Sequence, residues 1–361
     1  MSTSEFDEFR PPEGPRKRKR KRRRRPGMPR SGDGSREMPV VPDAEFSSYY
    51  GRPVVKPAPW GPDVAVYMFL GGIAGGSAVL AAGAQLTGRE ALRRNSRLAA
   101  LGAAGLGAVA LVRDLGRPER FVNMLRTFKV TSPMSVGSWI LTAFSTGAGV
   151  SAAAEVDRLT GARLPLGPLR RALRGLERPA GLVGLVTGPA LATYTAVLLS
   201  DTATPTWNEA REELPFVFAG SASAAAGGLA MVTTPVAQAG PGRVLAVLGA
   251  AGDLVADAVM EQRMDPTVAE SLHQGQAGRM LQASKALTAA GGVGALVLGG
   301  HRAGAVVSGA ALVAGSALTR LGIVQAGLDS AKDPRYTIDP QKRRLAERRA
   351  AGITDDSITT L

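Results

Sequence analysis

A few ionisable side chains interrupt the long apolar stretches of this chain. Asp253 and Asp257 stand four residues apart, hence on one side of a helix, and Glu261 follows at the end of the same stretch. Arg320 lies inside the last long apolar stretch. A charged group within a membrane is costly and usually faces a cavity or a partner charge. Two interpretations stay open: intramembrane ion pairs that fix the helix register, or part of a proton path.

A second group of side chains could bind a ligand. Tyr194 lies in an apolar stretch, where its hydroxyl needs a hydrogen-bond partner. That partner could be the membrane interface, or the carbonyl of a bound molecule. Lys56, Trp60 and Tyr67 stand at the start of the first apolar stretch. An aromatic belt at the membrane surface would explain the tryptophan and the tyrosine without any ligand.

The link between the second and third apolar stretches, residues 113–139, has an ordered pattern of its own. Gly116 and Pro118 are typical of a helix end, and Ser132 followed by Pro133 is typical of a new helix start. Between them, one face of a short amphipathic helix is formed by Phe121, Met124, Leu125 and Phe128. We expect this helix to lie in the membrane interface. The link is either a well-anchored connector or the lip of a binding site.

These residues sit within an all-α integral membrane protein of about eight transmembrane helices. Each apolar stretch is close to the ~20 residues that a bilayer requires. The predicted spans are 63–87, 98–113, 134–156, 179–200, 215–238, 243–262, 284–301 and 303–325, within a transmembrane domain of residues 46–328. Small residues dominate them, which allows close helix packing in a membrane.

Polar segments flank this domain. Residues 1–45 contain ten consecutive basic residues, Arg16–Arg25, and are predicted to be a disordered cytoplasmic tail that touches anionic lipids. Nucleic-acid binding is a less favoured use of such a run. Residues 329–361 form a second basic cytoplasmic tail. Both termini are therefore placed in the cytoplasm, although the arginine-rich loop 157–178 then falls outside, against the positive-inside rule.

Composition limits the cofactors that the chain can hold. There is no cysteine, which excludes disulfides, thiolate metal sites and the usual protein-bound iron–sulfur clusters. The two histidines, His273 and His301, are poorly placed for a haem that needs two facing ligands. We therefore predict no metal, haem or iron–sulfur cluster in this chain. Any electron transfer must use a bound organic molecule or a partner.

Several sequence segments resemble the membrane subunits of the NrfD/polysulfide reductase family. The segments are DLGRP, RF, MLR and SPMSVGSW within 114–139, WGPDVAVYMFLGGIAGG at 60–76, YTAVLLSDTATPTW at 194–207, PFVF at 215–218 and ALTRLGIVQAGLDSAKDPRYTIDP at 317–340. Their order and spacing extend the resemblance over roughly residues 50–345. The resemblance implies two four-helix bundles, with an exchangeable quinone or quinol bound in the first. It also implies a ferredoxin-like four-cluster iron–sulfur subunit and a catalytic subunit, often with molybdopterin.

The resemblance turns the second group of side chains into a candidate quinone site. A quinone site is expected to be an apolar pocket with a few convergent polar groups. The predicted topology places the start of the first span and the 113–133 link on one membrane face. The candidate quinone-binding residues are Tyr194, Lys56, Trp60, Tyr67, Asp114, Arg117, Ser132 and Ser135.

The implied function is a membrane anchor that exchanges electrons between the quinone pool and the iron–sulfur partner. Such a chain is not catalytic alone, because its partners supply the other redox centres. The alternative is a multi-pass secondary transporter, suggested by Gly-rich spans that are interrupted at Pro189 and Pro235. No internal repeat supports that alternative.

The composition generates a test of cofactor content. We expect the purified chain to show neither a haem Soret band nor iron–sulfur absorbance. A stoichiometric haem signal in the optical spectrum would overturn the assignment.

Overall fold

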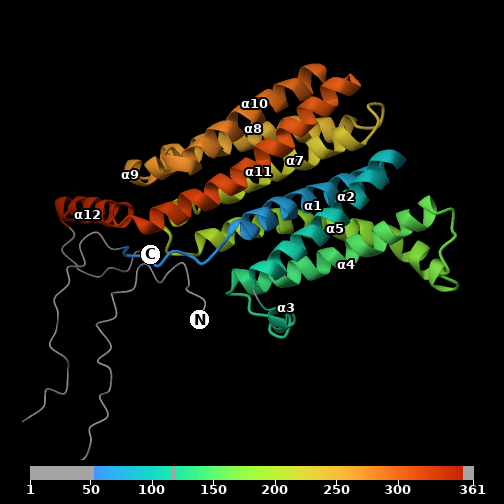
Figure 1. Cartoon of the computed structure of the whole chain (residues 1–361), viewed down its shortest axis with the longest axis horizontal. Helices are drawn as coiled ribbons and strands as arrows, with labels where there is room; N and C mark the ends of the chain where they lie inside the picture. Colours follow the sequence, from blue (N-terminus) through green and yellow to red (C-terminus); the bar gives the residue numbers. More distant parts are fainter. Residues whose placement is uncertain (1–52, 116, 118, 353–361) are drawn as a thin grey trace, which may run out of the picture. The chain divides into compact units, whose positions relative to one another are not determined.

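Within the described residues, every regular element is a helix (Figure 1). The structure is a computed structural model and describes residues 53–115, 117 and 119–352. Its elements are α1 (Pro62–Leu86), α2 (Glu90–Asp114), α3 (Glu119–Met124), α4 (Pro133–Leu159), α5 (Leu169–Ser200), α6 (Pro205–Glu209), α7 (Leu214–Thr233), α8 (Gly240–Arg263), α9 (Pro266–Ala269), the 3₁₀ turn η2 (Glu270–Leu272), α10 (Gly275–Leu298), α11 (Arg302–Lys332) and α12 (Arg335–Ala350). The predicted all-α class is confirmed. The tail 1–45, Gly116, Pro118 and the Phe121 side chain lie outside the described residues.

Six of these helices are both long enough and apolar enough to cross a membrane: α1, α2, α5, α7, α10 and α11. The chain is therefore an integral membrane protein. The prediction of eight spans is confirmed for these six only. α4 and α8 have comparable lengths, but α4 ends in Glu155, Asp157 and Arg158, and α8 carries Asp253, Asp257 and Glu261. Several helices also extend beyond the predicted spans: α2 begins at Glu90 rather than at residue 98.

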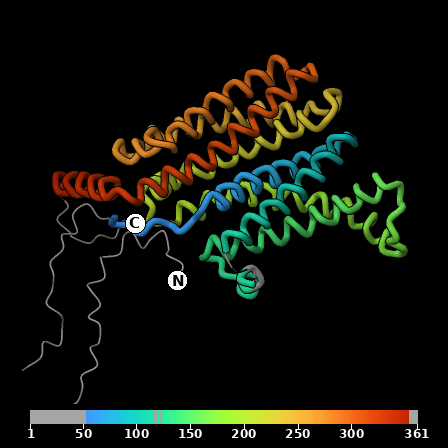
Figure 2. Tube along the Cα trace, in the orientation of Figure 1, coloured from blue at the N-terminus to red at the C-terminus, as the bar shows by residue number. Residues whose placement is uncertain are grey.

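Successive long helices reverse direction, so the links gather at two ends (Figures 1 and 2). The distal end holds the α1–α2, α4–α5, α7–α8 and α10–α11 links. Contacts between them include the Asn95 amide on the Thr233 carbonyl (2.7 Å) and the Arg302 guanidinium on the Met231 carbonyl (3.0 Å). The proximal end holds the start of α1, the α2–α4 link with α3, and the short helices α6, α9 and η2.

Small residues set the spacing between the long helices. A Cβ on Gly75 of α1 would lie 2.2 Å from the backbone oxygen of Gly188 on α5. A Cβ on Gly227 of α7 would lie 2.4 Å from the backbone nitrogen of Ala246 on α8. Backbones that approach this closely gain dispersion contacts, which drive helix association where lipid is as apolar as the side chains. α1 contacts α2, α5 and α7, and α11 contacts α10 and α7.

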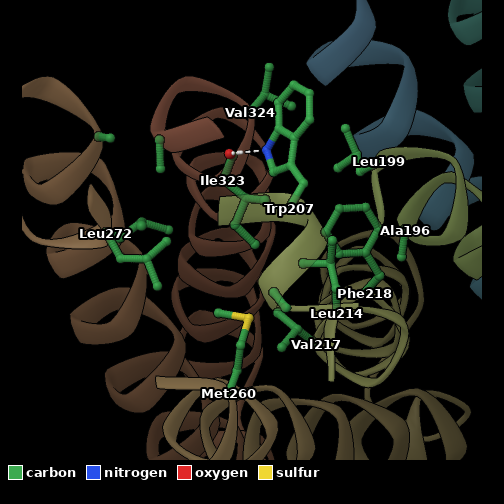
Figure 3. Close-up of a cluster of buried hydrophobic side chains, with 14 of the residues drawn as sticks. Ala196, Leu199, Trp207, Leu214, Val217, Phe218, Met260, Leu272, Ile323 and Val324 are labelled. Carbon is green, nitrogen blue, oxygen red and sulfur yellow. Dashed lines mark hydrogen bonds between the residues drawn. The ribbon is translucent and has the colours of Figure 1, made fainter. Parts of the chain in front are cut away.

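A tryptophan on the short helix α6 forms the centre of the proximal core (Figure 3). Trp207 is fully buried and donates its indole N–H to the Ile323 backbone oxygen of α11 at 2.8 Å. Gly327 leaves space for the ring, because a Cβ there would lie 2.0 Å from it. The Trp207 ring also stacks on the Trp60 ring, with ring centroids 5.4 Å apart. This stack connects α11 to the start of α1.

The α2–α4 link is less helical than predicted. The predicted amphipathic helix was to reach Phe128, but α3 ends at Met124 and gives way to turns. The physical reason lies in the hydrogen bonds that follow: the Ser135 hydroxyl donates to the Thr127 carbonyl (3.0 Å) and accepts from the Lys129 N–H (3.0 Å). These bonds fold the end of the link back onto the start of α4.

The region after α11, predicted only as a basic tail, contains α12. Arg335, Arg343 and Arg344 of this helix pair with Glu270, Asp265 and Glu209, respectively. The hydrogen bond to the Tyr336 hydroxyl and the nearby Glu270 carboxylate raise the pKa of the Arg335 guanidinium above its usual value. These pairs fix α12 to the proximal end.

A buried ionic cluster joins four helices at the distal end. Arg97 of α2 is 1 % exposed and pairs with Glu155 of α4 (2.9 Å) and Glu177 of α5 (2.5 Å), and it also donates to Gln85 of α1. Arg158 bridges the same two carboxylates, 3.0 Å from Glu155 and in contact with Glu177. Charges this deeply buried persist only where partners replace the lost water. The cluster therefore fixes the positions of the four helices relative to one another.

This cluster predicts the cost of removing its central cation. Arg97→Met leaves two buried carboxylates with fewer partners, so we expect a loss of about 3 kcal/mol of stability. Chemical unfolding of the detergent-solubilised chain measures it. Arg163→Met removes an exposed loop arginine and should change stability by less than about 0.5 kcal/mol. Equal effects of the two substitutions would contradict a fixing role for the cluster.

Candidate functional site

A pocket of about 80 Å³ opens at the proximal end, between α1, α2, α3, α4 and α5. Its walls are mainly apolar, and its polar atoms come from a few side chains. The lining consists of Trp60, Val64, Tyr67, Met68, Leu111, Asp114, Leu115, Met124, Met134, Ser138, Leu141, Tyr194, Thr195 and Leu198. An apolar cavity with a few convergent polar groups is the form that small-molecule sites take.

Two phenols meet inside this pocket. The hydroxyls of Tyr67 on α1 and Tyr194 on α5 form a hydrogen bond across the gap between the helices. Gly137 of α4 makes room for one ring, since a Cβ there would lie 2.0 Å from a Tyr194 ring carbon. Gly107 of α2 lies against the other, with its Cβ position 3.4 Å from the Tyr67 ring. Each tyrosine therefore rests on a glycine of a neighbouring helix.

The pocket also contains a buried hydroxyl without a partner. Thr195 is 2 % exposed, and its Oγ1 atom has no hydrogen bond within the described part of the chain. Most buried hydroxyls are satisfied, so such an atom calls for a specific explanation. Ser138 differs, because its hydroxyl already donates to the Met134 carbonyl at 2.9 Å. Thr195 is thus the side chain here with unused hydrogen-bonding capacity.

The structure brings together four of the eight candidate quinone-binding residues. Tyr194, Tyr67, Trp60 and Asp114 all line the pocket, although they lie on three helices and the segment before α1. The other four lie outside its lining. Lys56 and Arg117 are exposed.

The two predicted serines have structural contacts. Ser132 is the N-cap of α4, where its hydroxyl accepts from the Ser135 N–H at 3.4 Å. The Ser135 hydroxyl holds the end of the α2–α4 link, as described above. Both side chains therefore act on the backbone that borders the pocket.

Sequence reasoning did not include Thr195, Met124, Met134 or Gly137 in the site. Thr195 adjoins Tyr194, and a demand for buried polar atoms to be satisfied could have selected it. Gly137 lies within the recognised SPMSVGSW segment, but no local pattern shows that its Cα faces Tyr194. That contact joins residues 57 positions apart and depends on how α4 crosses α5.

The predicted ionisable group, Asp253, Asp257, Glu261 and Arg320, lies on α8 and α11. Lys285 of α10 pairs with Asp257 (2.8 Å) and Glu261 (2.6 Å), and His273 lies 3.8 Å from Glu261. Sequence reasoning missed Lys285, although it is the only lysine in α10. Asp257 and Glu261 are thus held by an ion pair to the neighbouring helix.

Asp253 and Arg320 do not form an ion pair within 4.0 Å. Arg320 is fully buried, lies 3.5 Å above the Phe218 ring centroid and donates one N–H to the Phe218 carbonyl at 2.8 Å. Its Nε and Nη1 atoms, and Oδ1 of Asp253, have no partner within the described residues. A cavity of about 10 Å³ between Asp253, Asp257, Ser284, Lys285 and Thr319 is near the smallest volume that holds a water molecule.

A larger groove, about 550 Å³, lies between α7 and α8. Its walls are mostly apolar, and three of its apolar side chains are exposed: Phe216, Leu248 and Val255. Its charged groups, Glu212, Glu213 and Arg263, are paired with one another at one end. It has no counterpart to the unpaired Thr195 hydroxyl or the tyrosine pair, so the smaller pocket is the better candidate site.

Comparison with known proteins identifies the family. A family model described as polysulphide reductase, NrfD, matches residues 54–241. The chain belongs to the NrfD family. The matched NrfD segment contains α1 to α7, hence the whole proximal pocket and the distal ionic cluster. It ends before Asp253, so the acidic group of α8 falls outside it. No curated protein matches the chain.

The glycine beneath Tyr194 generates a test of the site. Gly137→Ala places a methyl group into the ring and should displace it, costing about 1–3 kcal/mol of stability. Unfolding in detergent gives the stability, and tyrosine ultraviolet difference spectra report the ring environment. Gly149→Ala in the same helix meets no atom within 4 Å and serves as the matched control. An unchanged tyrosine spectrum in Gly137→Ala would show that the ring does not rest there.

Proposed function

We propose that this chain is the quinone-reactive membrane subunit of an oxidoreductase complex. It exchanges electrons between the quinone pool and a ferredoxin-like iron–sulfur subunit, which passes them to a catalytic subunit, often of molybdopterin type. Membership of the NrfD family supports this function. The observation that carries it is the buried tyrosine pair in an apolar pocket at one membrane end.

The residues of the pocket fit a quinone head group. The pocket volume corresponds to roughly five to eight water molecules, the scale of one six-membered ring with its two oxygens. Met124, Met134 and Leu198 offer apolar walls, and Trp60 offers an aromatic edge. The unpaired Thr195 hydroxyl gives a further polar group. A bound quinone would supply two-electron chemistry that no side chain of this chain provides.

The tyrosine pair orients such a ligand. In the Tyr67–Tyr194 hydrogen bond one hydroxyl donates and the other accepts, so the accepting hydroxyl keeps a proton to donate elsewhere. That proton can bond to a ligand carbonyl, while the second tyrosine holds the first in place. The Thr195 hydroxyl can donate to the same region of the pocket.

Asp114 is the ionisable group of the pocket. It is half-buried at the last residue of α2, next to the link that leaves the membrane. A carboxylate in this place can accept a proton from the pocket and release it to the aqueous side. Four further residues border this end of the pocket. We assign them either to supporting the pocket or to contacts with the partner subunit: Lys56, Arg117, Ser132 and Ser135.

The partner subunit is proposed to bind at the proximal end. The α2–α4 link exposes Phe128 (59 %), Val130 (74 %) and Met134 (48 %) beside the pocket, among basic residues such as Arg126 and Lys129. Exposed apolar side chains that cluster in this way mark interaction surfaces. A partner bound here would bring its cluster close to the quinone, which is the requirement for electron exchange.

The acidic residues of α8 are proposed to have two different roles. The Asp257–Lys285–Glu261 ion pairs favour a role in fixing the register of α8 and α10. Asp253 lies beside a small cavity and has no ion-pair partner among the described residues, so it is the group that favours a proton path.

The proposed architecture is eight spans in two four-helix bundles, with both termini in the cytoplasm. Contacts among α1, α2, α4 and α5, and among α7, α8, α10 and α11, support the two groups. The NrfD family match favours this reading over a transporter.

Tyr194→Phe tests the proposed function. It removes one hydroxyl and almost no volume, so the loss should be about 0.5–1.5 kcal/mol, or roughly a 2- to 10-fold weaker quinone affinity. Binding of a quinone analogue and quinol-coupled turnover in the assembled complex measure it.

Tyr336→Phe is the matched control for Tyr194→Phe, because Tyr336 lies on α12, outside the pocket lining. Assembly is checked separately for both variants. Normal binding by assembled Tyr194→Phe would mean that this hydroxyl is only an anchor. If the unaltered complex binds no quinone, the proposed function fails.

A further inference from the structure

The first ten residues of α5 extend beyond the length that a membrane needs. α5 has 32 residues, which corresponds to about 48 Å of helix. The uncharged part, residues 179–200, already covers the ~30 Å hydrocarbon core. Residues 169–178 therefore lie at the level of the lipid head groups at the distal end.

This segment carries two stripes of side chains. Arg171, Arg174 and Arg178 follow helical spacing and share one side of α5, and we name them the α5 arginine patch. Leu169, Leu173 and Leu176 share another side, and Leu169 and Leu176 are 65 % and 56 % exposed. Basic side chains at the outer end of a membrane-crossing helix lie at the level of the lipid head groups, where they attract anionic lipids.

The acidic residues nearby in the chain are already occupied. Between residues 155 and 178 the acids are Glu155, Asp157 and Glu177, and all three are buried. Glu155 and Glu177 belong to the ionic cluster, and Asp157 accepts from Arg170 at 3.0 Å. Arg170 also donates to two loop carbonyls, those of residues 162 and 164 (2.6 Å each).

Within the described part of the chain, the arginine patch has no charge partner. All three of its side chains are exposed, and none has an ion pair with any described residue. A guanidinium has five N–H donors in a fork that matches phosphate oxygens. The arginines directly precede the uncharged span 179–200, which places this fork at the level of the head groups.

We propose that the α5 arginine patch binds the phosphate groups of anionic phospholipids in the leaflet at the distal end. The three arginines bond the lipid phosphates at the level of the head groups. Bound lipid then holds the α4–α5 loop, which Arg170 already ties to α5. This site is separate from the quinone pocket.

Native mass spectrometry of the full chain, titrated with phosphatidylglycerol or phosphatidylcholine, tests the proposal. We expect the unaltered chain to prefer phosphatidylglycerol, and the preference to weaken at higher salt. Changing Arg171, Arg174 and Arg178 together to Gln should reduce the preference on the order of 10- to 100-fold, given roughly fivefold for each arginine near a membrane surface.

The control removes the same charge elsewhere. Arg126, Lys342 and Arg349 are exposed residues of the proximal end, and their joint change to Gln should leave most of the preference intact. Three outcomes would overturn the proposal: no preference in the unaltered chain, no change in the patch variant, or an equal loss in the control. Cross-linking of the patch to an acidic subunit in the assembled complex would assign it to a protein partner instead.

Discussion

The crossing of α1 and α5 is the contact on which the other features depend. Gly75 and Gly188 touch backbone to backbone, and a Cβ at either position would lie within 2.6 Å of the opposite carbonyl oxygen. In a membrane the hydrophobic effect does not hold helices together, so such close packing must do so. From this crossing the two helices carry Tyr67 and Tyr194 to the proximal end. In the other direction they carry Gln85 and Glu177 to the distal ionic cluster.

The two ends handle polar groups in opposite ways. At the distal end, both buried carboxylates of the ionic cluster have arginine partners, and the result is a fixed junction of four helices. At the proximal end, the two tyrosine hydroxyls share one hydrogen bond, and the Thr195 hydroxyl has no partner in the described residues. Buried charges that are paired across helices hold those helices together, whereas an unpaired hydroxyl in an apolar pocket suits an exchangeable ligand. This contrast supports placing the quinone at the proximal end.

The composition determines which parts of the proposed function belong to this chain and which belong to its partners. A chain without cysteine has no thiolate ligands for an iron–sulfur cluster, so the proposed function assigns those clusters to partner subunits. Its chemistry then depends on what binds at the two membrane faces. The proximal face presents an apolar and basic link beside the pocket, and the distal face presents the α5 arginine patch. The proposed partners of the two surfaces differ. The proximal surface lies next to the candidate quinone pocket and is proposed to bind the iron–sulfur subunit, whereas the α5 arginine patch is proposed to bind anionic lipids.

The sequence by itself determined the all-α membrane class and the order of the helices. These follow from local properties: an apolar stretch about as long as a bilayer is thick, the Gly and Pro residues at helix ends, and residue counts. It also selected Tyr67, Tyr194, Trp60 and Asp114, because buried hydroxyls and charges in apolar surroundings stand out in any sequence. Six of the eight predicted spans have the required apolar composition. α4 and α8 are less apolar, because they carry polar residues that pair with other helices.

Only the tertiary structure decided which of these residues meet. Arg97 contacts Glu155 and Glu177 across 58 and 80 residues, and Lys285 reaches Asp257 and Glu261 from another helix. Gly137 lies under the Tyr194 ring, and Trp207 fills the space above Gly327. Helical periodicity shows which side of a helix a residue is on, but not which helix lies opposite. That depends on crossing angles set by backbone contacts such as Gly75–Gly188, which no local pattern of the chain encodes.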